Sequence, residues 1–211
     1  MLEALVTPKE QIISISEEYT CQDAIQLLES EGLRCAPVLD ATGQIFRGNI
    51  YRYHLYQQKF RYPEVDLATL PVTRFIKNTT KVVRTSDSIL RLMFVMTDLP
   101  QIAVLSDQNT FIGIIYHRTL MQFFAQAWLS DHAKYVLEVT SSNQVGDLAR
   151  ITKLVTRYTD IITSITFEET QFRTPNKIFY VLPKSMDLVA LNDLERLMTR
   201  KGYPTKHYKI K

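Results

Sequence analysis

Two stretches decide the fold of this chain: GNIYRYHL at residues 48–55 and GIIYHRTL at residues 113–120. Each begins with glycine, has tyrosine fourth and leucine eighth, and carries cations just after the tyrosine. The recurrence of so specific a pattern indicates that one structural unit is present twice.

The residues around each stretch repeat one order of elements. In the first copy, alternation over 12–15 predicts a strand, Thr20 with Asp23 predicts a capping box that opens a helix, and Gly32 is placed to end that helix. Strands at 36–39 and 45–51, a turn at 40–43 and a helix at 52–59 complete this copy. The second copy, after an irregular linker over 57–71, has predicted strands at 81–85, 102–105 and 111–116, a helix capped by Ser86, and a helix over 119–129.

The pattern changes near residue 134. Strands are predicted at 135–140, 161–168, 177–182 and 206–210, with a helix over 146–158, a loop through 174–176 and a leucine-rich helix that ends near Gly202. The order βαββαβ describes a ferredoxin-like sandwich. The expected fold class is therefore α/β (α+β), with a repeat module over 1–133 (copies at about 1–60 and 71–130) and a second domain over 134–211.

The composition is that of an ordinary folded protein, with 45% hydrophobic and 22% charged residues among 211. A net charge of +3 suits an anionic small molecule and falls short of a dedicated nucleic-acid binder. The apolar runs are too short to span a bilayer, and residues 1–10 lack the layout of a signal peptide, so a cytoplasmic protein without membrane contact is expected. Cys21 and Cys35 are expected to be buried, inert thiols.

Signatures of catalysis are missing from the sequence. None of the six glycines forms a phosphate-binding or dinucleotide loop, no nucleophile elbow occurs, and the four histidines are far apart in sequence. We therefore expect no enzyme, no catalytic residue, no metal and no cofactor.

Residues 2–128 resemble a tandem CBS repeat (a Bateman module). The resemblance rests on the strand that leads into a capped helix, on the core strand Ala36-Pro37-Val38-Leu39-Asp40, and on the two closing strands that begin with glycine. It implies that the two repeats pack pseudo-symmetrically and leave two clefts, each combining the first and core strands of one repeat with the closing strand of the other.

The region after Lys134 resembles an ACT domain through Asn143-Gln144-Val145-Gly146-Asp147-Leu148, which is similar to the family's turn into its first helix. The resemblance implies an amino-acid effector site at Asn143, Gly146, Asp147 and Leu148. A tight turn that needs a residue without a side chain would also explain Gly146.

The closing strands depart from the CBS pattern that binds mononucleotides. In that pattern a hydroxyl and a carboxylate hold ribose and phosphate, whereas Tyr51 and Tyr116 stand at the hydroxyl position and His54 and Thr119 at the carboxylate position. The run Tyr116-His117-Arg118 is similar to that of the CBS-ACT cyclic di-AMP-binding proteins of Gram-positive bacteria, where cations meet the phosphates.

Arginine is suited to phosphate, and apolar strand edges with tyrosine rings are suited to purine faces. The resemblance, carried over position by position, lines the first cleft with Gln11, Ile12, Ile13, Leu33, Arg34, Cys35, Ala36, Tyr116, His117 and Arg118. It lines the second cleft with Lys81, Val82, Val83, Gln101, Ile102, Tyr51, Arg52 and His54.

Three functions follow from these patterns. The first is a non-catalytic, cytosolic receptor that binds cyclic di-AMP between the repeats and signals to a protein partner. The second is a metabolic sensor that binds AMP or ATP in the repeats, an amino acid at the ACT domain, or both. The third is an architectural dimer with empty clefts, in which Tyr51 and Tyr116 pack between the repeats. A homodimer is expected because single tandem modules tend to stack in pairs.

Overall fold

The computed structural model describes residues 2–128, 131–167 and 177–210, which form two compact units, Met1–Leu120 and Met121–Lys211. The division falls inside helix α4 (His117–Trp128). The sequence pattern changes later, near residue 134, and a domain boundary at that position stays a prediction. The two units are described separately below.

The first repeat contains β2 (Ile15–Ser16), α1 (Cys21–Ser30), β3 (Cys35–Leu39), β4 (Phe46–Tyr51) and α2 (Arg52–Arg61). Its sheet has the order β2-β3-β4, with β2 parallel and β4 antiparallel to β3. The core is filled by side chains such as Leu28, Val38 and Ile50, which are fully buried. Of the strand predicted over 12–15, only Ile15 is in a strand; residues 12–14 connect a short 3-10 helix, η2 (Lys9–Gln11), to β2.

Local capping signals were predicted correctly in one repeat and wrongly in the other. Thr20 and Asp23 form the predicted capping box, each side chain accepting a hydrogen bond from the backbone N–H of the other. In the second repeat the cap is Ser88, which accepts from the N–H of Arg91, and Ser86 is instead bonded to Asp107. Two serines two residues apart offer the same cap chemistry, and the sequence does not separate them.

The second repeat confirms the predicted duplication. It contains β5 (Val82–Arg84), α3 (Ile89–Val95), β6 (Gln101–Leu105) and β7 (Phe111–Tyr116), and α4 follows. As in the first repeat, its first strand is parallel and its closing strand antiparallel to the core strand, and the register shifts at the end of that core strand. Helix α4 begins two residues before the predicted helix, whose last residue, Leu129, lies outside the described residues.

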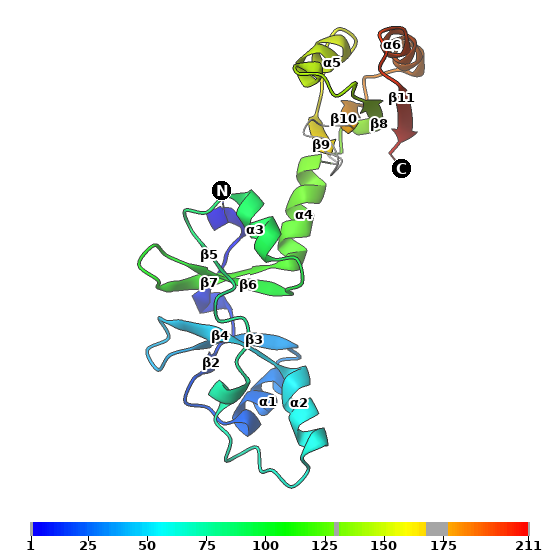
Figure 1. Cartoon of the computed structure of the whole chain (residues 1–211). Helices are drawn as coiled ribbons and strands as arrows, with labels where there is room; N and C mark the ends of the chain where they lie inside the picture. Colours follow the sequence, from blue (N-terminus) through cyan, green and yellow to red (C-terminus); the bar gives the residue numbers. More distant parts are fainter. Residues whose placement is uncertain (1, 129–130, 168–176, 211) are drawn as a thin grey trace. The chain divides into compact units, whose positions relative to one another are not determined.

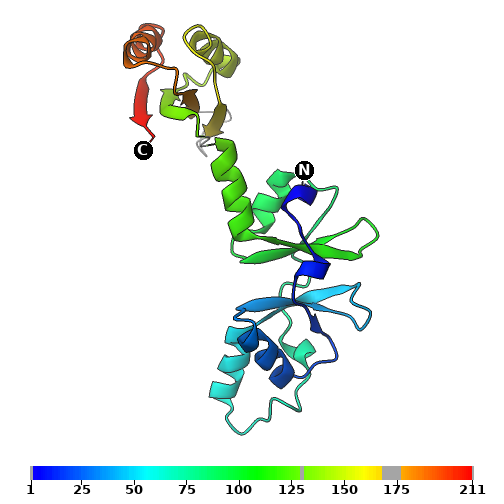
Figure 2. The ribbon, with the colours of Figure 1, turned by 180° about the vertical axis from the view of Figure 1, so that it is seen from behind.

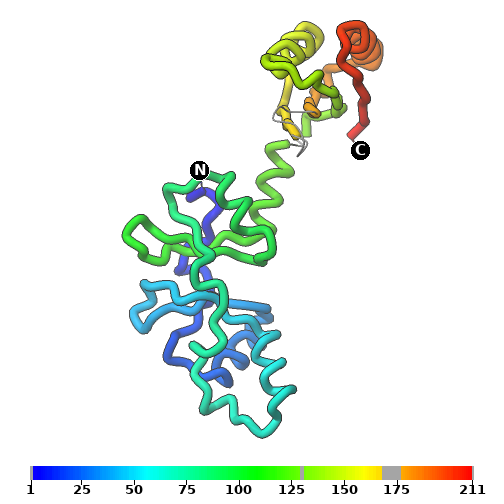
Figure 3. Tube along the Cα trace, in the orientation of Figure 1, coloured from blue at the N-terminus to red at the C-terminus, as the bar shows by residue number. Residues whose placement is uncertain are grey.

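The first segment of each repeat pairs with the closing strand of the other. Strand β1 (Thr7–Pro8), which follows the 3-10 helix η1 (Leu2–Leu5), is antiparallel to β7 and completes the sheet β1-β7-β6-β5. Lys77, just after η3 (Val72–Phe75), bridges Asn49 of β4 in the same way. Figure 3 shows the N-terminal trace beside the trace of the second repeat. This exchange was not predicted.

This pairing between repeats explains why glycine stands at positions 48 and 113, the first residues of the two repeated stretches. A Cβ on Gly113 would lie 2.2 Å from the Thr7 carbonyl oxygen, and one on Gly48 would lie 2.8 Å from the Lys77 carbonyl oxygen. Both distances are shorter than a carbon side chain tolerates, so any other residue would push the crossing segment away.

The sheets of the two repeats face each other, with α1 and α2 on one outer side and α3 and the start of α4 on the other (Figures 1 and 2). Between the sheets, the rings of Phe46 and Phe111 stack at 5.9 Å, and the Phe111 N–H donates to the Gln44 carbonyl at 2.7 Å. Ile12, Val82 and Tyr116 pack against the same apolar cluster. The two repeats therefore share one core.

The C-terminal unit has the predicted ferredoxin-like topology. It contains β8 (Ala133–Thr140), α5 (Asp147–Val155), β9 (Thr163–Phe167), β10 (Lys177–Pro183), α6 (Leu188–Arg200) and β11 (Thr205–Lys209), with the antiparallel strand order β11-β8-β10-β9. Both helices cover one face of this sheet (Figure 1). Helix α5 is shorter than the predicted 146–158, and the predicted loop at 174–176 lies outside the described residues.

No helix in the described ranges is long and apolar enough to cross a membrane.

Candidate ligand-binding site

A pocket of about 200 Å³ opens between the two repeats of the N-terminal unit. The segment before β2, the end of α1, strand β3 and strands β6 and β7 all contribute to it. Its wall combines apolar side chains with polar groups, namely one acid, two amides and a tyrosine hydroxyl. The lining residues are Gln11, Ile12, Ile13, Glu31, Leu33, Cys35, Pro37, Gln101, Ile114 and Tyr116.

The pocket brings together most of the predicted first cleft, namely Gln11, Ile12, Ile13, Leu33, Cys35 and Tyr116. Ala36 does not line it, because its side chain is buried in the core of the first repeat. Arg34, between Leu33 and Cys35, and Arg118, two residues after Tyr116, are exposed. His117 is half-buried, and its backbone N–H donates to the Pro100 carbonyl at 2.9 Å. These three residues border the pocket in sequence without forming its wall.

Sequence reasoning missed Glu31, Pro37 and Ile114 and assigned Gln101 to the other cleft. Successive side chains of a strand point to opposite faces, so the cleft face of β3 carries Cys35 and Pro37 while Ala36 faces inward. Gln101 is the direct neighbour of Tyr116 across the β6–β7 pair and shares its face. Strand alternation and pairing, rather than consecutive numbering, would have found these residues.

The floor of the pocket is held by a buried amide pair. Gln101 Nε2 donates to Asn49 Oδ1 at 3.1 Å, and both side chains are almost completely buried. Asn49 belongs to β4 of the first repeat and Gln101 to β6 of the second. The pair therefore fixes the position of one repeat against the other at the base of the pocket.

The groups at the pocket differ in their charges. Burial raises the pKa of the Cys35 thiol to about 11, so this thiol is neutral at pH 7 and is not a nucleophile. Burial also raises the pKa of Tyr116, with a smaller contribution from Cys35, and the positive charge of Arg118 opposes that increase. Arg118 makes no ion pair within the described part of the chain.

The pseudo-symmetric cleft is built differently. Tyr51, the counterpart of Tyr116, accepts a hydrogen bond from Asn78 Nδ2 at 2.7 Å. Arg52, which follows Tyr51 directly, pairs with Glu29 at 3.2 Å. In the second cleft, therefore, the tyrosine hydroxyl is bonded to Asn78 and the arginine charge is neutralised by Glu29. No hydrogen bond to the Tyr116 hydroxyl and no ion pair of Arg118 occurs within the described residues.

The other predicted residues of the second cleft are dispersed. Val83 and Ile102 are fully buried, and Val82 packs between the sheets. Lys81 is exposed, and His54 meets the Tyr51 ring edge-on at 5.8 Å. The structure does not gather these residues around a common space as it does those of the first cleft.

The predicted effector site of the C-terminal unit is organised around Asp147, which faces inward. Its carboxylate accepts hydrogen bonds from Ser141, Ser142, Tyr203 and Arg150 at 2.7–3.0 Å. Burial raises the pKa of Asp147, but these hydrogen bonds outweigh burial and hold the pKa well below its usual range. The carboxylate therefore fastens the loop and is not left available to a ligand.

The neighbours of Asp147 complete a tight turn. Asn143 and Gly146 both have positive φ, 62° and 85°, and Leu148 is 43% exposed. The turn alone accounts for the glycine. Within the described ranges, no group of three or more His, Cys, Asp or Glu side chains is arranged to hold a metal ion.

No protein-family model and no curated protein matches this chain. Several solved structures are similar to it. A CBS domain protein from Streptococcus pneumoniae is 19% identical, with 62% of this chain and 89% of that one aligned and a TM-score of 0.55. CbpB of Listeria monocytogenes, solved with c-di-AMP, is 18% identical over 59% of this chain and 95% of that one (TM-score 0.52). CBSX2, solved with AMP, is 18% identical over 58% and 94% (TM-score 0.50).

These likenesses, over about three fifths of the chain, place its fold in the class of CBS domain proteins. The further ferredoxin-like domain follows from the strand order β11-β8-β10-β9. At such low identity the likenesses show the fold alone.

Proposed function

We propose that the chain is a non-catalytic, cytosolic receptor that binds cyclic di-AMP between its CBS repeats and signals its occupancy to another protein. The observation that carries this proposal is a pocket between the repeats that combines apolar side chains with polar groups. Its lining residue Tyr116 is followed two positions later by Arg118, an exposed arginine that makes no ion pair among the described residues. Similar folds have been solved with c-di-AMP and with AMP, which supports a nucleotide as the ligand class.

The pocket has room for one purine. At about 200 Å³ it is smaller than the ~300–1,000 Å³ of sites that enclose a whole drug-sized ligand. Ile12, Leu33 and Tyr116 would flank the purine, and Glu31 would accept hydrogen bonds from an exocyclic amino group. The phosphates would stay outside, where Arg118 and Arg34 offer positive charge.

The alternative is a mononucleotide sensor, in which AMP or ATP enters the same pocket and the C-terminal unit, if it is an ACT domain, binds an amino acid. The likeness to the AMP-bound CBSX2 favours it. The residues here favour the cyclic ligand, because Tyr116 and Thr119 stand where a hydroxyl and a carboxylate would hold the ribose and phosphate of a mononucleotide. At the predicted effector site, the Asp147 carboxylate is already hydrogen-bonded to Ser141, Ser142, Arg150 and Tyr203, so it is not available to bind the ammonium group of an amino acid.

Titration calorimetry of the full chain tests the ligand. We expect cyclic di-AMP to bind with one molecule per chain, because the second cleft has its tyrosine and its arginine already bonded. AMP, ATP and amino acids should bind much more weakly. A preference for AMP would refute the ligand assignment, and two equal sites per chain would refute the predicted difference between the clefts.

A homodimer completes the proposal. Tyr53, Tyr56 and Phe60 lie three and four residues apart on α2, with Phe60 86% exposed. On α3, Leu90 and Phe94 are also exposed, Phe94 by 81%. Apolar side chains gathered on helix faces are typical of protein interfaces. We therefore expect two chains of 24.5 kDa to associate through these helices.

Light scattering after gel filtration tests this association. The wild type should be a dimer at micromolar concentration, and the double variant Phe60→Ser, Phe94→Ser should be a monomer. Phe167→Ser, which removes a 58% exposed phenylalanine of β9, is the matched control and should leave the dimer intact. A monomeric wild type, or a dimer lost only in the control, would contradict the proposed interface.

A further inference from the structure

The C-terminal unit contains a small basic pocket that the nucleotide proposal does not use. It has a volume of about 280 Å³ and is lined by Arg150, Lys153, Leu154 and Arg157 of α5 and its end, together with Lys201 and Tyr203 beyond α6. Four of its six lining residues are cations, and no acidic side chain is among them.

The cations of this pocket are largely uncompensated. Arg150 pairs with Asp147 at 2.7 Å, whereas Lys153, Arg157 and Lys201 make no ion pair within the described ranges. Lys153 lies in the last turn of α5 and Arg157 in the turn that follows, and both line the same pocket, so their like charges repel. An anion in the pocket would relieve that repulsion.

One of these cations is held firmly in place. Asp147 binds Arg150 Nη2, and the Tyr203 hydroxyl lies 3.4 Å from Arg150 Nε and donates to Asp147 at 3.0 Å. Tyr203 is almost fully buried and Leu154 is half-buried, so together they give the pocket an apolar base. A preorganised guanidinium beside exposed lysines suits a phosphate group, because arginine meets two phosphate oxygens at once.

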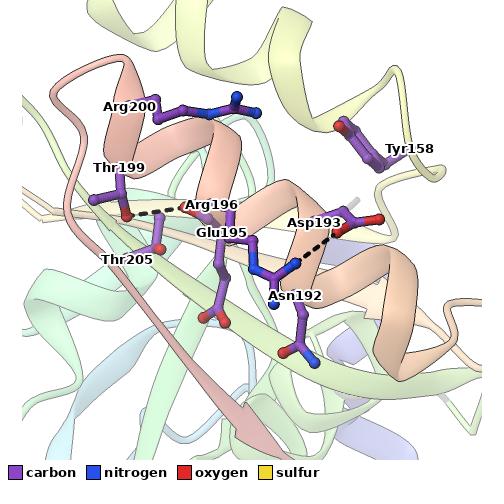
Figure 4. A pocket seen from close by; sticks show the side chains of 8 residues that line it. All are labelled: Tyr158, Asn192, Asp193, Glu195, Arg196, Thr199, Arg200 and Thr205. Carbon is purple, nitrogen blue, oxygen red and sulfur yellow. Dashed lines mark hydrogen bonds and ion pairs between the residues drawn. The ribbon is translucent and has the colours of Figure 1, made fainter.

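A second, larger hollow along α6 contains both acids and cations. It is lined by Tyr158, Asn192, Asp193, Glu195, Arg196, Thr199, Arg200 and Thr205. Figure 4 shows Arg196 turned toward Asp193, and the two form an ion pair at 3.5 Å. Glu195 of the same hollow pairs with His207 at 3.0 Å. Arg200, which also lines this hollow, makes no ion pair within the described ranges, but Asp193 and Glu195 share the hollow with it. The smaller pocket has four cations and no acid, and this balance favours a small anion there.

We propose that the pocket formed by Arg150, Lys153, Arg157, Lys201 and Tyr203 binds a small phosphorylated molecule with two or three negative charges. The site is separate from the cleft between the CBS repeats and would give the protein a second input. Three uncompensated cations match such a charge, and the pocket admits one or two phosphate groups with a small apolar part.

Calorimetry of the full chain with inorganic pyrophosphate tests the site. The wild type should bind one pyrophosphate per chain, with an affinity that falls as salt is added. The double variant Lys153→Ala, Arg157→Ala should bind it at least about tenfold more weakly, since two charged hydrogen-bond donors are lost. The control Arg61→Ala, Lys209→Ala removes the same charges from exposed positions elsewhere and should bind like the wild type.

Three results would overturn the proposal. The first is a wild type that does not bind pyrophosphate, or that binds a short single-stranded oligonucleotide instead. The second is an equal loss of affinity in both double variants, which would reflect net charge alone. The third is a loss of cyclic di-AMP binding in the Lys153, Arg157 variant, which would make the pocket part of the other site. Failure of cyclic di-AMP to bind any variant would refute the proposed function and leave this site standing.

Discussion

Replacing Arg118 by alanine is expected to weaken cyclic di-AMP binding roughly ten- to hundredfold, as measured by titration calorimetry. A hydrogen bond to a charged group is worth about 1.5–3 kcal/mol, and Arg118 has no acidic partner among the described residues that would compete with a phosphate. Arg118→Lys should recover only part of the affinity, because one ammonium does not reproduce the two parallel donors of a guanidinium.

The control for this substitution is Arg61→Ala, which removes an equal charge from the exposed end of α2. It should leave the affinity within a factor of about two, because exposed charges beyond a Debye length of ~8 Å are screened at physiological salt. If Arg118→Ala binds cyclic di-AMP as tightly as the wild type does, Arg118 is not part of the site. Arg34, beside the opposite wall of the pocket, would then be the cation to test.

Replacing Asp147 by alanine is expected to destabilise the C-terminal unit by about 3 kcal/mol, since a buried carboxylate with several charged or neutral donors would be lost. Hydrogen–deuterium exchange of peptides from α5 and β8 measures this unit separately. Their protection should fall about a hundredfold at pH 7. Asp193→Ala, which breaks an exposed ion pair on α6, is the control and should change protection by less than about fivefold.

The effect of Asp147 should depend on pH in a defined direction. The pKa of Asp147 in the folded protein lies below its value of about 3.9 in an unfolded chain, so the carboxylate stabilises the fold above pH 4. As the pH falls below 4, the unfolded state takes up a proton first and the stabilisation is lost progressively. Wild type and Asp147→Asn should therefore converge in stability at low pH. A difference that stays constant from pH 7 to pH 3 would show that the hydrogen bonds act without the charge.

The elements that the sequence predicted are those encoded by local signals. The capping box at Thr20, the glycine after α1 and the spacing of leucines in α6 each depend on residues within a few positions, and each has the expected structure. The similar stretches at 48–55 and 113–120 predicted the duplication because their shared residues are also close together in the sequence. Where two local signals were equivalent, as with Ser86 and Ser88, the prediction of the helix cap was wrong.

The features that were not predicted depend on contacts between distant segments. Nothing near Thr7 marks it as a strand, because its partner is Ile114 of the other repeat. Gln101 belongs to the pocket through its pairing with Tyr116, and Arg52 is neutralised by Glu29 of a different helix. The cleft could be predicted from the family pattern, but the difference between the two clefts arises from these side-chain partners.

The crossing of the first segment also affects the order in which the chain can fold. Leu2 and Leu5 are buried beside β1, yet the strand that β1 pairs with is synthesised only after the whole first repeat. During translation, which proceeds from the N-terminus, these leucines leave the ribosome about a hundred residues before the strand they pack beside. Closing so long a loop adds an entropic cost to the folding transition state. Nascent chains arrested before Phe111 should therefore expose this segment to chaperones and proteases, even when the helices of the first repeat have formed.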